Sequence, residues 1–399
     1  MADYKIFASI VDDATKQQVE EAATCEAYKD CAIRVMPDCH AGSGCTIGSV
    51  IRFNGRVVPN TVGVDIGCGM LVTELGKVDI DLAELDRIVT ELIPSGFEIH
   101  KYPKVYTNEF DELNCKDVIN RDYMLCSIGT LGGGNHFIEI DKDEDGNKYL
   151  VIHSGSRNLG VKVCNYWQEK AISNLTDNSR ERNELIARLK AEGRQNEIGN
   201  ALKELKKPEI NTALAYIEGA DLAGYLSDMR LCQQYAVLNR DTMANIILEA
   251  LGFGYVEQFT TIHNYIEIPT NTIRKGAISA KNGEKVIIPM NMRDGSLICI
   301  GKGNADWLES APHGAGRIMS RAQAFKSVQM DEFKKSMEGI YTTSVCEGTL
   351  DEAPMVYKSA DIIRKDIQPT VEIIKVIKPI WNFKAKTPES GRILKNRKK

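Results

Sequence analysis

The sequence is poor in histidine, has no Cys-x-x-Cys pair and contains no long apolar run. Six histidines occur in 399 residues, and none of the eleven cysteines lies three positions from another. This spacing argues against a zinc ribbon or a thioredoxin-like site. No run of ~20 apolar residues suggests a membrane helix, and the N-terminus has no apolar signal core. We therefore expect a cytoplasmic protein with reduced thiols and no membrane contact.

The composition is otherwise that of an ordinary globular protein. Hydrophobic residues make up 43% of the chain and charged residues 26%, which excludes wholesale disorder. The net charge of −5 argues against a generally basic nucleic-acid coat but leaves room for a local basic groove. Repeats, linkers and low-complexity tracts are absent. We expect one domain spanning residues 1–399.

Periodicity predicts an α+β fold, a mixed α/β body with a helical excursion at 161–250. Residues 1–160 are predicted as strands and glycine-rich loops, with one helical pattern at 80–92. The charged run 179–207, ended by Pro208, is typical of a solvated helix, and an RNA-contacting arm is the alternative. The basic tail 395–399 is predicted to fray. Short strands are expected at 32–35, 149–152, 286–288, 297–300 and 371–377.

Most of the histidines stand in polar or glycine-rich segments, whereas His100 looks incidental. A lone histidine is usually structural, but several in such settings suggest a shared site. Imidazole is the commonest metal ligand among side chains, and it also serves as a nucleophile or a proton shuttle. The histidines in these segments are His40, His136, His153, His263 and His313.

A carboxylate and a thiol accompany them, because Asp65 and Cys68 lie three residues apart among glycines. Taken alone, this segment would suit an ordinary turn. Together with imidazoles, the two groups suit Mn²⁺, Fe²⁺ or Zn²⁺ better than Mg²⁺. A thiolate can bridge two ions, and paired ions serve phosphoryl chemistry.

The glycine loops also suggest phosphate binding through backbone N–H groups. There is no Walker A motif, so a P-loop nucleotide hydrolase is not expected. For each arginine named below, the alternative to phosphate binding is a surface charge that has no ligand. Charge for a phosphate is available from Arg157, Arg274, Lys275, Arg317 and Arg321.

Six motifs, in order along nearly the whole chain, resemble the RtcB family of RNA ligases. They are MPDCHAG at 36–42, VDIGCG at 64–69, GGGNHFIE at 132–139, HSGSR at 153–157, HN at 263–264 and APHGAGR at 311–317. The resemblance implies a single RtcB-type domain and a GTP- and Mn²⁺-dependent ligase. Such enzymes join RNA ending in a 3′-phosphate or 2′,3′-cyclic phosphate to RNA with a 5′-hydroxyl, in tRNA splicing or RNA repair.

The same resemblance assigns roles residue by residue. His313 matches the histidine that becomes guanylylated, and Arg157 and Arg321 match RNA-phosphate ligands. Two Mn²⁺ ions would share Cys68. The implied metal ligands are Asp65, Cys68, His136, His153 and His263, and the implied guanine-nucleotide contacts are Asn135, Glu139, Tyr357 and Lys384.

One segment departs from the family pattern. Family members often carry Pro-Gly-Ser-Met where this chain has Pro-Met-Asn-Met at 289–292. We assign no ligand from that loop. Two other functions remain open: a metal-dependent phosphodiesterase that opens cyclic RNA ends without joining them, and a catalytically silent RNA-binding protein. Neither would need His313.

Overall fold

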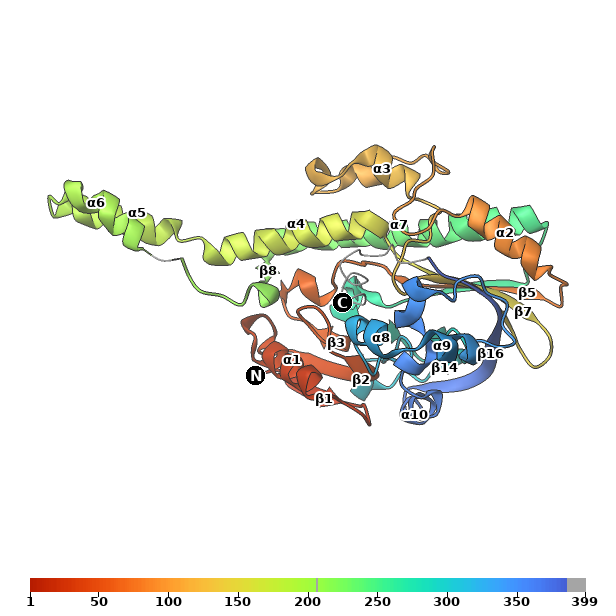
Figure 1. Cartoon of the computed structure of the whole chain (residues 1–399). Helices are drawn as coiled ribbons and strands as arrows, with labels where there is room; N and C mark the ends of the chain where they lie inside the picture. The colour runs from red at the N-terminus through yellow and green to blue at the C-terminus, as the bar shows by residue number, and fades with distance from the viewer. Residues whose placement is uncertain (206, 386–399) are drawn as a thin grey trace.

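The computed structural model describes residues 1–205 and 207–385, so the basic tail 395–399 lies outside the described residues. Two β-sheets form the body, and long helices lie along one side of it (Figure 1). The helices are α1 (Asp13–Thr24), α2 (Leu82–Leu92), α3 (Arg121–Cys126), α4 (Arg157–Thr176), α5 (Ser179–Ala191), α6 (Ile198–Glu204), α7 (Gly219–Leu251), α8 (Arg321–Ser327), α9 (Met330–Ser336) and α10 (Ala360–Asp366).

The smaller sheet combines the start of the chain with a segment far downstream. Its first two strands are parallel, and the remaining pairs are antiparallel. The strand order is β1 (Asp3–Ile6), β2 (Ala32–His40), β3 (Ile47–Arg52), β11 (Thr272–Lys275) and β10 (Asn264–Glu267).

The larger sheet is antiparallel throughout and carries most of the candidate site at one end. Two short two-stranded ribbons accompany the two sheets. One pairs β12 (Ala277–Ser279) with β15 (Ser310–Pro312), and the other pairs β4 (Arg56–Val57) with β8 (Ile217–Glu218). The order in the large sheet is β13 (Lys285–Asn291), β14 (Gly295–Gly301), β16 (Val371–Phe383), β6 (Phe137–Lys142), β7 (Lys148–Ser154), β5 (Gly69–Gly76) and β9 (Glu257–Ile262).

Both faces of the larger sheet are buried. On one face, Leu71 and Ile152 pack with Val89 of α2 and Ile247 of α7. On the other face, Met70 and neighbouring side chains pack against residues from β13 and β14. Successive side chains of a strand point to opposite faces, so β5 contributes alternate residues to each cluster. Polar groups of a site therefore lie mainly near the ends of the strands and in the adjoining loops, and a polar residue inside a strand, such as Glu139 of β6, is buried.

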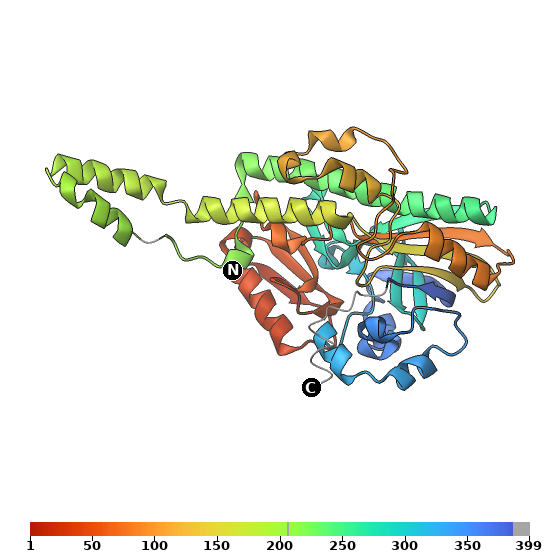
Figure 2. The same ribbon diagram turned by 45° about the horizontal axis from the view of Figure 1, so that its top comes forward.

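Segment 161–250 contains the predicted helical excursion. Helices α4 and α7 run along the body, and α5 and α6 project away from it (Figures 1 and 2). The charged run is not one helix ended by Pro208, because the chain turns between Ala191 and Ile198 and α6 ends at Glu204. At that turn Arg194 forms exposed ion pairs with Glu192 and Glu197.

Two local predictions for the first 160 residues were wrong. Strand β2 does not end before Pro37 but continues to His40, because an irregular register after Val35 spares the proline a ladder hydrogen bond. Helix α1 was not predicted. Its buried face consists of small side chains and a single valine, Val19, so its apolar periodicity is weak.

The predicted α+β fold class is confirmed, as are the helix at 80–92 and the late strand within β16. The single-domain assignment for 1–399 stays a prediction. Among the described residues, no helix is both long and apolar enough to span a membrane.

Asp228 on α7 is a fully buried tie between three segments. Its carboxylate accepts hydrogen bonds from the Trp167 indole of α4 at 2.9 Å and from the Asn114 backbone N–H at 2.8 Å. We expect Asp228→Ala to lower the free energy of unfolding by about 3 kcal/mol, because it leaves buried donors without acceptors. Urea denaturation measures this change. Glu249→Ala, at an exposed position of the same helix, should stay within about 0.5 kcal/mol of the parent.

Candidate metal and nucleotide site

The five predicted metal ligands meet at one end of the larger sheet. His153 lies on β7 opposite Met70 of β5 and Phe137 of β6. Cys68 and His136 directly precede β5 and β6, so they lie at the same end of the sheet as His153. His263 follows β9, whose Ile262 pairs with Gly69. The antiparallel register therefore brings residues from four strands to one place.

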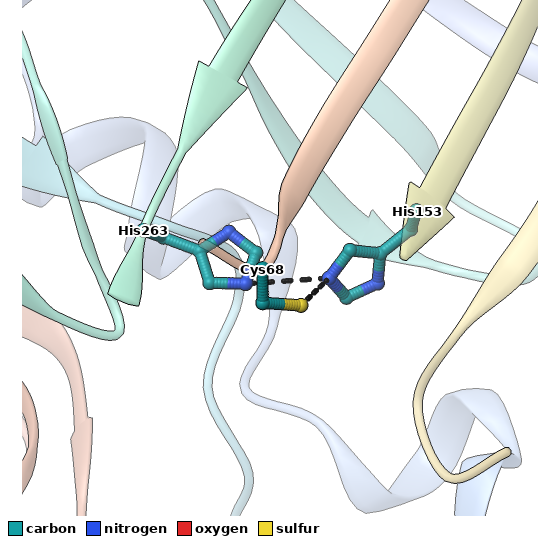
Figure 3. Close-up of side chains that lie close together, drawn as sticks. All are labelled: Cys68, His153 and His263. Carbon is teal, nitrogen blue, oxygen red and sulfur yellow. Dashed lines mark hydrogen bonds between the residues drawn. The ribbon is translucent and has the colours of Figure 1, made fainter. Parts of the chain in front are cut away.

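Cys68 stands at the centre of the cluster. Its Sγ lies 3.2 Å from His153 Nε2, which is 3.3 Å from His263 Nε2 (Figure 3). On its other side, Sγ lies 3.5 Å from His136 Nε2, which is 2.9 Å from Asp65 Oδ2. Cys68 thus belongs to two groups, each of which could hold a metal ion.

Hydrogen bonds behind the rings orient two of the histidines. The Nδ1 atom of His136 lies 2.9 Å from the Leu131 carbonyl oxygen, and that of His153 lies 3.1 Å from the Asn135 carbonyl oxygen. Carbonyl oxygens only accept, so Nδ1 donates in both rings, and in His153, whose lowered pKa makes the ring neutral, Nε2 presents a lone pair to the cluster.

The electrostatics of the cluster suit a cation. Burial, together with neighbouring histidines, lowers the pKa of His153 and His263 well below the usual value, so both rings are neutral ligands. Burial and the Asp65 carboxylate raise the pKa of the Cys68 thiol. A divalent cation would reverse that effect, because it stabilises a coordinated thiolate. One carboxylate, one thiol and three imidazoles fit a transition-metal dication.

Two adjacent polar residues of α7, Asn239 and Arg240, hold the turns that carry these ligands. Arg240 is fully buried and donates from Nη1 to the carbonyls of Gly67 at 2.9 Å and Ser154 at 2.8 Å. Asn239 bonds to both backbone groups of Thr130. Gly67 has a φ of +72°, and a β-carbon there would crowd the backbone of α7. Sequence reasoning missed both residues, since they fall inside a predicted helix without a motif.

His313 lies beside the cluster, with its ring centroid 4.8 Å from that of His263. The buried Asp38 carboxylate accepts from His313 Nδ1 at 2.6 Å and from its backbone N–H at 3.1 Å. This contact orients the ring and leaves Nε2 as the nitrogen that Asp38 does not engage. Asp38 stood in the first of the six motifs, but sequence alone did not connect it to a histidine 275 positions away.

A cavity of about 200 Å³ opens next to His313, and the predicted nucleotide contacts line it. Glu352, which sequence reasoning missed, organises the wall. It accepts from the Tyr357 hydroxyl at 2.7 Å and from Lys384 Nζ at 3.0 Å, and it pairs with Arg321. The assigned residues on the wall are Asn135, Glu139, Tyr357, Lys384 and Arg321, and the loop 289–292 also contributes.

Glu139 is a buried acid in this wall. Burial raises its pKa, against the opposing charge of Lys384 and a hydrogen bond from Asn382. Its side chain lines the cavity, where a carboxyl oxygen can accept a hydrogen bond from a ligand that offers N–H donors.

The two arginines assigned to RNA phosphate occupy different places. Arg321 lines the cavity and pairs with Asp351 and Glu352. Arg157 begins α4 outside the cavity lining and donates to the Gly96 carbonyl at 2.9 Å and to Thr130 Oγ1 at 3.2 Å. Its φ of +56° is uncommon for a residue with a side chain.

The remaining candidates divide into wall and core. His40 lines the cavity, and burial lowers its pKa to about 4, so the ring is neutral. His100 is structural, with Nε2 3.0 Å from the Gly129 carbonyl oxygen. Arg274 is buried against Glu267, and Lys275 bonds to a backbone carbonyl, so neither faces the cavity. Arg317 lines it.

Comparison with known proteins gives the family. The family model described as "tRNA-splicing ligase RtcB" matches residues 18–123 and 115–385. The chain belongs to the RtcB family. The RNA-splicing ligase RtcB of Escherichia coli K12 is 30% identical over 408 residues, covering 92% of this chain and 93% of the relative. The tRNA-splicing ligase RtcB of Archaeoglobus fulgidus is 27% identical over 456 residues, covering 90% and 89%. The RtcB resemblance and its enzyme class, RNA ligase, are confirmed at that level.

Because Cys68 belongs to both ligand groups, we expect Cys68→Ala to weaken metal binding more than any other cysteine substitution. Titration with Co²⁺ tests this, since a cobalt–thiolate bond gives a near-ultraviolet charge-transfer band. The parent should show the band and Cys68→Ala should lose it, with affinity lower by about tenfold or more. Cys299→Ala, at a buried cysteine outside both groups, should keep it. A band that persists without Cys68 contradicts the assignment.

Proposed function

We propose that this chain is a GTP- and Mn²⁺-dependent RNA ligase. It would join RNA ends bearing a 3′-phosphate or 2′,3′-cyclic phosphate to RNA bearing a 5′-hydroxyl, through a histidine–GMP intermediate. One observation supports this most strongly: His313, oriented by Asp38, lies between a cluster of metal-ligating side chains and a cavity walled by charged groups.

The nucleotide would occupy that cavity. Glu139 would accept hydrogen bonds from the N–H groups on the guanine edge, for which adenine has no equivalent pair. Lys384 and Arg321 supply positive charge near Glu352 and can turn to phosphate oxygens when a nucleotide enters. The side chains of the wall thus provide both base recognition and charge neutralisation.

In the first step, His313 Nε2 would attack the α-phosphorus of GTP. An N–P bond forms, the bond to the β-phosphate oxygen breaks, and pyrophosphate leaves. Asp38 keeps the Nδ1 proton in place and stabilises the positive charge that develops on the ring, as the carboxylate of a catalytic triad does.

In the second step, an oxygen of the RNA 3′-phosphate would take the GMP from His313, restoring the neutral ring. The 5′-hydroxyl oxygen then attacks that 3′-phosphate, a phosphodiester forms and GMP leaves. A cyclic end must first be opened to a 3′-phosphate by water. Arg157 would hold an RNA phosphate at the rim, outside the nucleotide cavity.

The metal site fits this chemistry through its donors. Asp65, Cys68, His136, His153 and His263 would hold two Mn²⁺ ions that share the Cys68 thiolate. When bound, such ions offset negative charge on the phosphates and the leaving group. We further propose that the substrates arise in tRNA splicing or RNA repair, in the cytoplasm.

Labelling with α-³²P-GTP in the presence of Mn²⁺ tests the intermediate directly. The parent protein should acquire label, and His313→Ala should acquire none because it lacks the attacking nitrogen. His100 is buried and is not a suitable control, so Glu249→Ala, at an exposed position of α7 outside the cavity lining, serves as the comparison. It should still become labelled. Absence of label in the parent would favour the phosphodiesterase or the silent RNA-binding protein.

Asp38→Asn should keep the shape of the His313 contact while removing its charge. We expect the labelling rate to fall roughly a hundredfold or more, because the amide neither fixes the tautomer nor stabilises the charged ring. Single-turnover labelling measures the rate. Asp145→Asn, in the exposed turn between β6 and β7, is the matched control and should label like the parent. A normal rate in Asp38→Asn would contradict the role given to this carboxylate.

A further inference from the structure

Three exposed aromatic side chains gather in one short segment near Arg157. Phe97 is 81% exposed, Tyr102 66% and Tyr106 77%. Two other large aromatics in the described part of the chain, Tyr255 and Tyr341, are exposed, and they lie in different regions. Exposed aromatics within ten residues are too concentrated to be the scattered apolar residues of an ordinary surface.

The segment is held firmly while these rings point outward. His100 is buried and bonds to the Gly129 carbonyl, and Val105 packs against the main core. Phe110, where the segment ends, is buried. The residues that anchor the segment are therefore separate from the exposed aromatics, which leaves the rings free to contact a ligand.

Backbone hydrogen bonds place the segment beside the loop that leads to His136. Leu131 N–H donates to the Pro94 carbonyl and Gly96 N–H to the Gly132 carbonyl, both at 2.9 Å. The Leu131 carbonyl in turn accepts from His136 Nδ1. In Figures 1 and 2 the chain between α2 and α3 passes beside the start of α4, where Arg157 lies.

Arg157 connects this segment to the proposed phosphate site. Its guanidinium donates to the Gly96 carbonyl, one residue before Phe97. A β-carbon at Gly132 would overlap that guanidinium, so the loop is shaped around it. Phe97 is therefore the exposed aromatic residue that follows directly on the Arg157 contact. An RNA strand with a phosphate on Arg157 would reach it first.

The charges favour RNA over a protein partner. Lys101 and Lys104 are exposed between the aromatics, and Lys101 Nζ lies 5.4 Å from the centre of the Tyr102 ring. Glu98 is the one acidic residue among positions 97–106, and the acidic residues Glu109, Asp111 and Glu112 lie beyond the last of the three aromatics, with Asp111 paired to Arg121. Single-stranded RNA is bound by aromatic faces that stack on bases and by lysines that neutralise phosphates. An apolar protein interface would have little use for solvated lysines at its centre.

We infer that Phe97, Tyr102 and Tyr106 form a stacking platform for the single-stranded nucleotides next to the RNA end held at Arg157. The inference rests on the proposed function and extends it from the reacting ends to the strand behind them. Stacking is tolerant of base identity, so the platform would bind RNA ends of many sequences.

Substitution by leucine separates stacking from apolar contact. The triple variant Phe97→Leu, Tyr102→Leu and Tyr106→Leu keeps apolar bulk but removes the ring faces. A second triple variant, Phe97→Tyr, Tyr102→Phe and Tyr106→Phe, keeps three rings. Tyr255→Leu, an exposed tyrosine in another region, is the matched control. Binding of a fluorescent single-stranded RNA with a 3′-phosphate is followed by anisotropy, at several salt concentrations.

We expect the leucine variant to bind RNA about tenfold or more weakly, while the aromatic variant and Tyr255→Leu bind like the parent. Labelling by α-³²P-GTP, which needs no RNA, should be unchanged in all three, which shows that the fold and the catalytic centre are intact. Parent-like RNA binding by the leucine variant would overturn the inference. Equal weakening of RNA binding in both triple variants would also overturn it. So would a leucine variant that binds RNA like the parent but no longer binds a protein partner.

The two proposals fail separately in this experiment. If the parent acquires no label from GTP but the leucine variant loses RNA affinity, the platform stands and the ligase mechanism falls. If labelling is normal and the leucine variant binds RNA like the parent, the ligase mechanism stands and the platform falls.

Discussion

Arg240 is buried without a carboxylate partner among the described residues, and the candidate site depends on how its charge is satisfied. The guanidinium donates to the carbonyls of Gly67 and Ser154, the immediate neighbours of Cys68 and His153. A buried cation is costly unless hydrogen-bonded and near negative charge. The Asp65 carboxylate and the Cys68 sulfur lie close enough to act on this charge. Arg240 of α7 thus ties the turn before β5 to the end of β7, next to the ladder pair Gly69 and Ser154.

The site has two compartments, the cluster of candidate metal ligands and the cavity, with His313 between them. On one side, neutral imidazoles, a thiol and a carboxylate converge on positions suited to cations. On the other, Glu352 holds Tyr357, Lys384 and Arg321 around a cavity in which charges are paired until a ligand competes for them. Arg157 lies outside the cavity lining, where its guanidinium donates to the Gly96 carbonyl, next to the segment that carries the exposed aromatics.

Local sequence patterns predicted α2 from its apolar periodicity, α7 as part of the helical excursion and β16 from its β-branched residues. They failed where other forces decided. Helix α1 buries mostly small side chains, and β2 crosses Pro37 through an irregular register. In the charged excursion, composition indicated a solvated helix, and the structure divides the run into α5 and α6 with a turn between them.

The sequence by itself determined the chemistry of the site, because ligand type is a property of each side chain and the motifs that carry Cys68, His136 and His313 are short and distinctive. Only the tertiary structure decided which of these groups touch. Antiparallel register brings together residues up to 198 positions apart in the metal cluster (Asp65 to His263), and Asp38 reaches His313 across 275. Asn239, Arg240 and Glu352 carry no local signature, and the motif that holds Asp38 does not name its partner, since these roles come from contacts made across the fold.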